Sequence, residues 1–111
     1  MLTFQLAPKE KRPLRILCVG AHSDDIEIGC GGTILRLLQD CAETEVHWVV
    51  LGSSGQRDAE ALLSAHNFLA DARKKDVIVK NFKNSFFPYV GAEIKTFFEE
   101  LKETVSPDVI F

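Results

Sequence analysis

The sequence has no long apolar run and only four prolines among its 111 residues. Its strongly apolar stretches, such as residues 48–51, are a few residues long, whereas a membrane-spanning helix needs about 20. Pro8, Lys9 and Pro13 interrupt the N-terminus before an apolar block of the signal-peptide kind could form. We therefore expect no membrane partner.

Cysteine and positive charge are also scarce. Cys18, Cys30 and Cys41 are an odd number of cysteines without paired spacing, which is typical of reduced thiols in a cytoplasmic protein rather than of a disulfide framework. The chain has 13 Lys+Arg against 16 Asp+Glu, a net charge of −3. Its bulk charge therefore does not attract nucleic acid, and no nucleic-acid partner is expected.

What the sequence does contain is an alternation of strand-like and helix-like segments. Its length suits one domain over residues 1–111, with residues 1–13 as a loose lead-in. Strands are expected at residues 15–20, 46–51, 76–79 and 108–111, and amphipathic helices at residues 33–41, 57–72 and 92–105. This alternation predicts an α/β fold class, a Rossmann-like three-layer α/β/α arrangement. The expected parallel sheet has strand order 3-2-1-4 and stops after the fourth strand.

Acidic residues follow the first expected strand, where a Rossmann fold binds its ligand. A dinucleotide-binding turn would carry G-x-G-x-x-G there, but Asp24, Asp25 and Glu27 would repel a phosphate. They favour a cation instead. His22 and Asp25 supply an imidazole and a carboxylate suited to zinc, and Asp24 between them is placed to act as a general base. The alternative is a helix start, with an aspartate as cap or dipole partner.

The same loop resembles a known protein family. Its residues Ala21-His22-Ser23-Asp24-Asp25, then Glu27, Gly29, Gly31, Gly32 and Thr33, resemble the LmbE-like (PIG-L) family of zinc-dependent deacetylases of N-acetylglucosamine-type sugars. The family signature is Ala-His-Pro-Asp-Asp, a Glu two positions on, and Gly-Gly opening the next helix. Only the proline differs, replaced here by Ser23. We expect the glycine cluster at residues 29–32 to let the backbone approach a neighbour closely.

The resemblance implies a role for each of these residues. His22 and Asp25 would bind Zn²⁺, Asp24 would be the general base, and Glu27 would lie behind the metal ligands. For Glu27 a solvated position in the first helical turn is the alternative. After the second strand, Arg57 and Glu60 match an Arg and a Glu three residues apart in the family, which implies that Arg57 binds substrate. The alternative is an ordinary ion pair at the start of a helix.

A zinc site with three protein ligands needs one more residue. His47 and His66 each lie about 13 Å along their elements from the carboxyl edge of the sheet, so both are interpreted as packing or surface residues. In the family the third ligand comes from a His-x-x-Asp-His-type block after the fourth strand. This chain ends inside that strand, so it resembles the N-terminal half of a longer enzyme.

The resulting hypothesis is zinc-dependent hydrolysis of the N-acetyl group of an amino sugar or its glycoside by metal-activated water. The alternative is a catalytically inactive Rossmann-like remnant that acts only as a folding or interaction module. The aromatic segment at residues 82–89 would bury its rings against the sheet, line the rim of a pocket, or meet another subunit in a homo-oligomer.

Overall fold

The fold is taken from a computed structural model that describes residue 6, residues 11–41 and residues 43–111. Most of the expected lead-in, residues 1–5 and 7–10, lies outside these described residues. The elements, in chain order, are β1 (Leu14–Gly20), α1 (Asp25–Asp40), β2 (Thr44–Val50), α2 (Gln56–Phe68), β3 (Lys74–Val79), a short 3-10 helix (Phe87–Val90), α3 (Gly91–Thr104) and β4 (Val109–Ile110).

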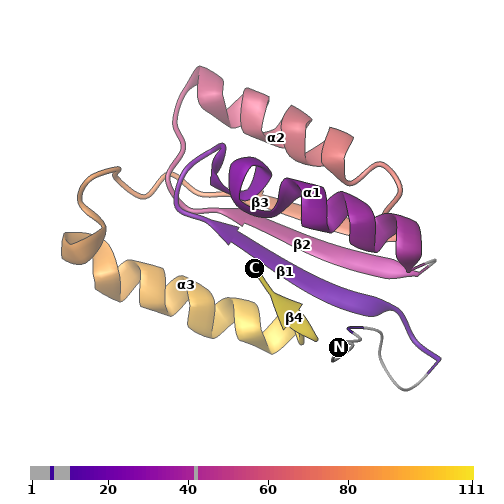
Figure 1. The fold of residues 1–111 in the computed structure, drawn as a ribbon. Helices are drawn as coiled ribbons and strands as arrows, with labels where there is room; N and C mark the ends of the chain where they lie inside the picture. Colours follow the sequence, from indigo (N-terminus) through magenta and orange to yellow (C-terminus); the bar gives the residue numbers. More distant parts are fainter. Residues whose placement is uncertain (1–5, 7–10, 42) are drawn as a thin grey trace, which may run out of the picture.

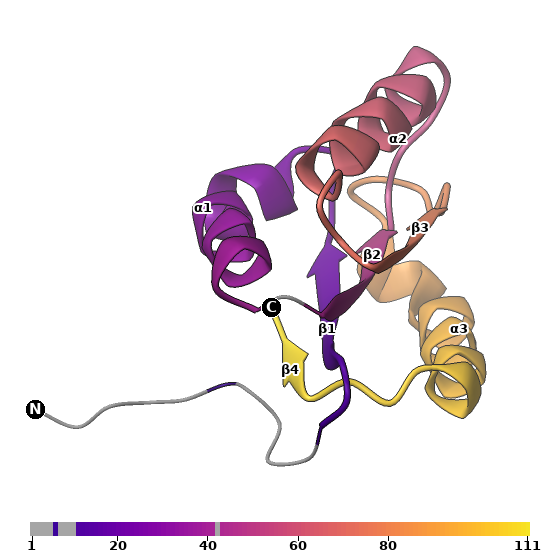
Figure 2. The same cartoon turned by 90° about the vertical axis from the view of Figure 1, so that its right-hand side faces the viewer.

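The four strands form one parallel sheet with the order β3-β2-β1-β4. Helices α1 and α2 cover one face of the sheet and α3 covers the other (Figures 1 and 2). This arrangement confirms the expected α/β fold class and the strand order 3-2-1-4. Among the described residues, no helix is both long enough and apolar enough to cross a membrane.

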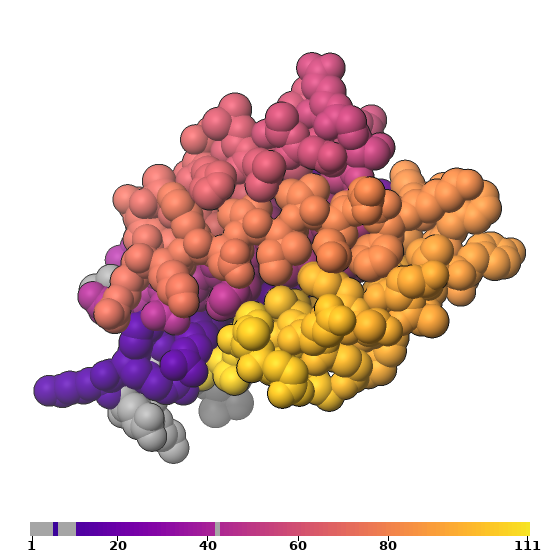
Figure 3. Space-filling model, turned by 180° about the vertical axis from the view of Figure 1, so that it is seen from behind, coloured from indigo at the N-terminus to yellow at the C-terminus, as the bar shows by residue number. Residues whose placement is uncertain are grey.

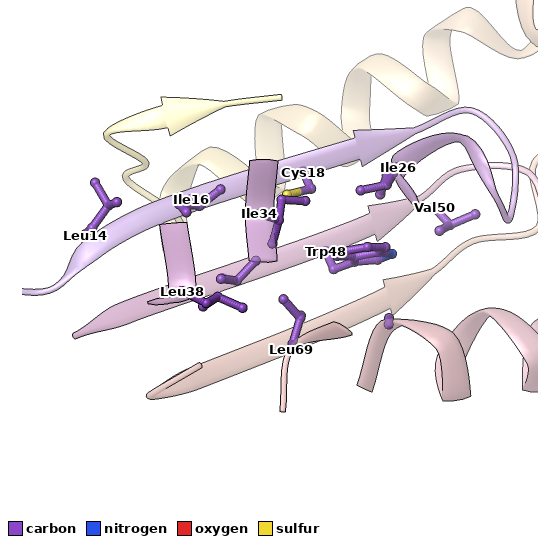
Figure 4. Close-up of a cluster of buried hydrophobic side chains, with 11 residues drawn as sticks. Leu14, Ile16, Cys18, Ile26, Ile34, Leu38, Trp48, Val50 and Leu69 are labelled. Carbon is purple, nitrogen blue, oxygen red and sulfur yellow. The ribbon is translucent and has the colours of Figure 1, made fainter. Parts of the chain in front are cut away.

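The two central strands, β1 and β2, bury apolar residues on both faces, since helices cover both sides of the sheet. Ile16 and Cys18 in β1 point toward α1 and α2, together with Trp48 in β2 (Figure 4). Leu17 and Val49 belong to a second cluster, which includes residues of α3. Burial raises the pKa of the Cys18 thiol to about 12, so Cys18 stays protonated and acts as a small apolar residue.

The strand register brings three loops to one edge of the sheet. Gly20, the last residue of β1, is opposite Val50, and Val50 is opposite Val79. The loops that follow β1, β2 and β3 therefore leave the sheet side by side. On the other side of β1, the Phe111 amide donates to the Leu17 carbonyl at 2.9 Å. The expected adjacency of the first and fourth strands is thus confirmed.

Helix α1 begins at Asp25, eight residues before the expected start at Thr33. Its buried residues Ile26 and Ile34 show that the helical stripe extends back through the glycines. The close approach expected at this cluster occurs within the fold. A Cβ on Gly31 would lie 2.7 Å from the Phe68 ring of α2, whereas Gly29 and Gly32 have no neighbour within 4 Å.

The other boundaries differ from the expected ones by at most two residues, except that α2 ends four residues early. That helix ends at Phe68 rather than at residue 72, because the chain turns there to bury Leu69 completely in the core. The Arg73 amide then donates to the Thr44 carbonyl at 2.9 Å, which starts the pairing of β3 with β2.

The aromatic segment divides between two environments. Phe82 and Phe87 pack against the cluster under α3, while Phe86 is 42% and Tyr89 83% exposed. The segment between β3 and α3 lies at the edge of the molecule (orange in Figure 3). Burial against the sheet is therefore confirmed for two rings, and contact of the exposed pair with another subunit stays a prediction.

Candidate functional site

The His22 and Asp25 side chains meet at the carboxyl end of β1. Asp25 Oδ2 accepts a hydrogen bond from the His22 backbone N–H at 2.8 Å and lies 3.3 Å from His22 Nδ1. The turn is tight, since a Cβ on Gly20 would lie 3.0 Å from the Ile26 side chain and 3.2 Å from the His22 carbonyl oxygen. Gly20 is therefore what lets the chain turn directly from strand to helix.

The other side of the His22 ring is held by the segment after β3. His22 Nε2 is 2.8 Å from Asn84 Oδ1, and the ring stacks on Phe87 with centroids 6.1 Å apart and planes 14° from parallel. Sequence reasoning missed Asn84 and its role beside His22. The available signal was a polar side chain after the third strand, at the same edge of the sheet.

Gly52, at the end of β2, makes this assembly fit. Its amide donates to the Ala21 carbonyl at 2.8 Å. A Cβ on Gly52 would lie 3.0 Å from both the Ala21 oxygen and the Phe87 ring. The missing side chain thus allows the first loop and the aromatic segment to approach each other, and that approach places Phe87 beside His22.

The spacing of His22 and Asp25 suits two ligands of one tetrahedral ion. Zinc bonds of about 2.0–2.2 Å at tetrahedral angles separate ligand atoms by roughly 3.3–3.6 Å, and Nδ1 and Oδ2 are 3.3 Å apart. In the part of the chain that the structure describes, no group of three His, Cys, Asp or Glu side chains gathers at one point. The described residues therefore bring together two side chains that could bind a metal ion, and no third.

The two remaining histidines lie elsewhere, as expected. His47 Nδ1 is 3.4 Å from Asp76 Oδ2, across the pair of strands β2 and β3, and His66 is exposed near the end of α2. Neither joins His22 and Asp25 within the described residues.

Asp24 stands at the N-cap position of α1 but does not act as a hydrogen-bonding cap. Its side chain makes no capping hydrogen bond. The residue is exposed and lines a cavity of about 530 Å³ together with Glu27 and Arg57. The helix-cap interpretation of Asp24 thus finds no support in the geometry, and its carboxylate is accessible to a molecule in the cavity.

Glu27 reaches toward α2. Its Oε1 accepts a hydrogen bond from Ser64 Oγ at 2.7 Å, and its buried Oε2 has no hydrogen-bond partner among the described residues. The side chain is thus half-buried and hydrogen-bonded rather than fully solvated. The placement of Glu27 behind the metal ligands stays a prediction.

Arg57 lies between two cavities. It lines the cavity that holds Asp24 and also a second cavity of about 270 Å³ with His22, Asn84 and Lys83. In the described parts of the chain, Arg57 forms no ion pair with Glu60. The alternative of a helix-start ion pair thus finds no support in this geometry, and substrate binding by Arg57 stays a prediction.

The two cavities differ in charge. The one beside His22 is lined by Arg57 and Lys83 and by no carboxylate, whereas the one beside Asp24 is lined by three carboxylates, Asp24, Glu27 and Glu60. A polar ligand spanning both would meet donors on one side and acceptors on the other. Such a site suits a polyhydroxylated molecule better than an apolar one.

Two comparisons with known proteins bear on the family of this chain. The chain is 36% identical over 59 residues to the uncharacterized deacetylase YaiS of Escherichia coli (strain K12), a match that covers 53% of this chain and 30% of YaiS. The chain thus spans less than a third of that relative. The profile of the PIG-L family, described as GlcNAc-PI de-N-acetylase, matches residues 17–111. That match runs from the middle of β1 to the end of the chain and includes every candidate site residue, and the chain therefore belongs to the PIG-L (LmbE-like) family of deacetylases.

Proposed function

We propose that this chain carries the metal-binding and proton-accepting residues of a zinc-dependent hydrolase. The reaction is removal of the N-acetyl group from an amino sugar or its glycoside. The observation that carries the proposal is the 3.3 Å separation of His22 Nδ1 and Asp25 Oδ2 at the carboxyl end of β1. The family description, a de-N-acetylase of a GlcNAc compound, supports the choice of substrate class.

Each residue has a distinct task in this proposal. His22 and Asp25 hold the metal, and zinc, when bound, lowers the pKa of water and polarises an amide carbonyl. Asp24, whose carboxylate faces the cavity beside Arg57, accepts the proton of the attacking water as general base. Cleavage of the C–N bond then releases acetate and leaves the amine on the sugar.

Arg57 binds the substrate in this proposal. A guanidinium donates hydrogen bonds to sugar hydroxyls or to a phosphate substituent, and Arg57 lines both cavities. It therefore orients the sugar between His22 and Asp24. The free thiols of Cys18, Cys30 and Cys41 support a reducing, cytoplasmic location for the reaction.

The test uses the chain itself and supplies the third ligand from solution. With Co²⁺ as a spectroscopic probe, we expect weak binding by the chain alone and stronger, tetrahedral binding when imidazole is added, because imidazole stands in for the third protein ligand. His22→Ala should abolish this response. His66→Ala, which removes an exposed histidine, is the matched control and should keep it.

Activity is then measured as acetate released from an N-acetylglucosaminide by the chain with Zn²⁺ and imidazole. Release that depends on His22 supports the deacetylase. Metal binding that is unchanged in His22→Ala would overturn the proposed metal centre. Binding without any acetate release, even with imidazole present, would favour the interaction module.

A further inference from the structure

Asn84 presents its side-chain oxygen, rather than its nitrogen, to His22. The same atom, Oδ1, lies 2.7 Å from the Ser85 backbone N–H and 2.8 Å from His22 Nε2. A backbone N–H can only donate, so the atom that faces it must be the amide oxygen. This assignment therefore does not depend on how the ring of His22 is protonated.

The identity of that oxygen fixes the position of the hydrogen on His22. An amide oxygen only accepts, so Nε2 must carry the hydrogen in order to bond to it. In a neutral imidazole Nδ1 then has the free lone pair. Nδ1 is the atom that lies 3.3 Å from Asp25 Oδ2, so the lone pair is on the side where the proposed metal binds.

The turn that holds Asn84 is strained, which indicates that its conformation is not the default of the chain. Ser85 has φ 65°, and no other residue besides glycine has positive φ among the described residues. Such a conformation is sparsely populated for a residue with a side chain and persists where the surroundings impose it. Here the Phe86 amide donates to the Lys83 carbonyl at 3.1 Å, and Phe87 stacks on His22.

We propose that Asn84 is a positioning residue that selects the Nε2–H tautomer of His22 before any metal binds. The consequence for metal binding rests on the proposed function, but the tautomer itself does not. Without Asn84, the nearest partner for a ring N–H is the Asp25 carboxylate beside Nδ1. The hydrogen would then shift to Nδ1 and occupy the position that the metal needs.

The first experiment reads the tautomer directly in the metal-free chain. Two-bond ¹H–¹⁵N NMR spectra distinguish Nε2–H from Nδ1–H, and they are recorded on the alkaline side, where the ring ¹⁵N shifts of His22 no longer change with pH. We expect Nε2–H for wild-type His22. Asn84→Leu, which keeps the shape and removes the acceptor, should raise the Nδ1–H population, and Asn84→Asp should restore Nε2–H.

The matched control is Asn81→Leu, since Asn81 lines the same cavity without a hydrogen bond to His22 within the described residues. It should leave the tautomer unchanged. Asn84→Leu should also weaken Co²⁺ binding by roughly 10- to 100-fold, as is usual for a partner of a metal-binding histidine. The wild-type spectrum needs no variant to fold.

Nδ1–H in the wild-type chain, or unchanged Nε2–H in Asn84→Leu, would overturn the proposal. The chain could also show the expected change of tautomer in Asn84→Leu and yet bind no Co²⁺. That result would support the positioning role of Asn84 and overturn the proposed function. The two failures are therefore distinguishable.

Discussion

Asp24 and Asp25 are neighbours in sequence but differ in what surrounds their carboxylates. Asp25 accepts a hydrogen bond from the His22 amide and lies beside the His22 ring. Asp24 lies one residue earlier, lines the cavity beside Arg57 and makes no capping bond. The first geometry suits a metal ligand and the second suits a base that exchanges a proton with a bound molecule.

We predict that the two asparagine substitutions separate these roles. Asp25→Asn should weaken Co²⁺ binding by more than the ~10- to 100-fold typical of residues behind the ligands, because a neutral oxygen replaces an anionic ligand. Asp24→Asn should keep the metal and slow acetate release by about 10²–10⁴-fold, because an amide cannot accept the proton. Metal titration and acetate release are measured on both variants with imidazole present.

The converse pattern, with metal lost in Asp24→Asn and retained in Asp25→Asn, would exchange the two roles. Full metal binding and activity in both variants would show that the two aspartates serve only to start helix α1. Asp71→Asn serves as the control, since Asp71 is exposed and remote in sequence from the site.

At the residue scale, the sequence was informative where the site is local. His22, Asp24 and Asp25 lie within four positions, so one loop brings them together. Asn84 and Phe87 reach His22 across more than 60 residues, since the hydrogen bond to Asn84 spans 62 positions. No local pattern encodes such a contact, because it depends on the register that aligns the loops after β1 and β3.

At the scale of elements, the packing of α1 on α2 explains one glycine of the signature. Gly31 is buried in α1, and a Cβ there would lie 2.7 Å from the Phe68 ring, which itself packs on Trp48 at 5.9 Å between centroids. Gly32 is exposed and has no neighbour within 4 Å of an added Cβ. The helix packing therefore leaves no room for a side chain at position 31, whereas position 32 has room for one.

We predict that alanine stabilises the chain at position 32 but not at position 31. Gly32→Ala should raise the free energy of unfolding by about 0.5–1 kcal/mol, the usual gain in helix propensity. The free energy of unfolding of Gly31→Ala should be about 1–3 kcal/mol lower than that of Gly32→Ala, because the new methyl group overlaps the Phe68 ring. The free energies are measured by urea unfolding of both variants. Equal values would contradict the prediction, because they would show that α1 and α2 can move apart at Gly31 without loss of stability.

The strands could be predicted because two-sided burial makes them continuous apolar runs. The start of α1 could not, because glycine normally disfavours helix and a run of acidic residues after a strand is typical of a loop. The periodicity needed to find it was present, since Ile26, Ile34 and Leu38 are the buried positions of one helical stripe. Tertiary packing, which the sequence does not state, outweighs the low propensity.

At the scale of the whole molecule, the two ends of the described chain are tied together. The Arg12 guanidinium donates two hydrogen bonds to Asp108, at 2.8 and 2.6 Å. Asp108 also accepts from the Arg15 amide at 2.9 Å, and its own amide donates to the Arg15 carbonyl at 2.8 Å. Residues 12 and 108 are 96 positions apart, and the sequence, which predicts only a loose lead-in at residues 1–13, does not indicate that they meet. Their contact anchors β4 to β1.

The Arg12–Asp108 contact makes the stability of the molecule depend on pH. Hydrogen bonds from Arg12, followed by that from the Arg15 amide, lower the pKa of Asp108 from 3.8 to about 2. A carboxyl whose pKa is lower in the folded state stabilises it at pH values above the unfolded pKa, and this stabilisation is lost as pH falls toward the folded pKa. The contribution of Asp108 is therefore complete above about pH 4 and disappears between about pH 4 and 2.

We predict that Asp108→Asn lowers the free energy of unfolding at neutral pH by about 1 kcal/mol, the upper end for an exposed ion pair. Its effect should shrink as pH falls from 4 to 2, because wild-type Asp108 becomes protonated there and loses the same interaction. The measurement is urea unfolding at several pH values, with Asp71→Asn as the charge-matched control. A loss of stability that is the same at pH 2 and pH 7 would show that Asp108 acts through its shape and neutral hydrogen bonds, and not through its charge. A loss confined to neutral pH would show that the charge of Asp108, paired with Arg12, holds the last strand beside the first.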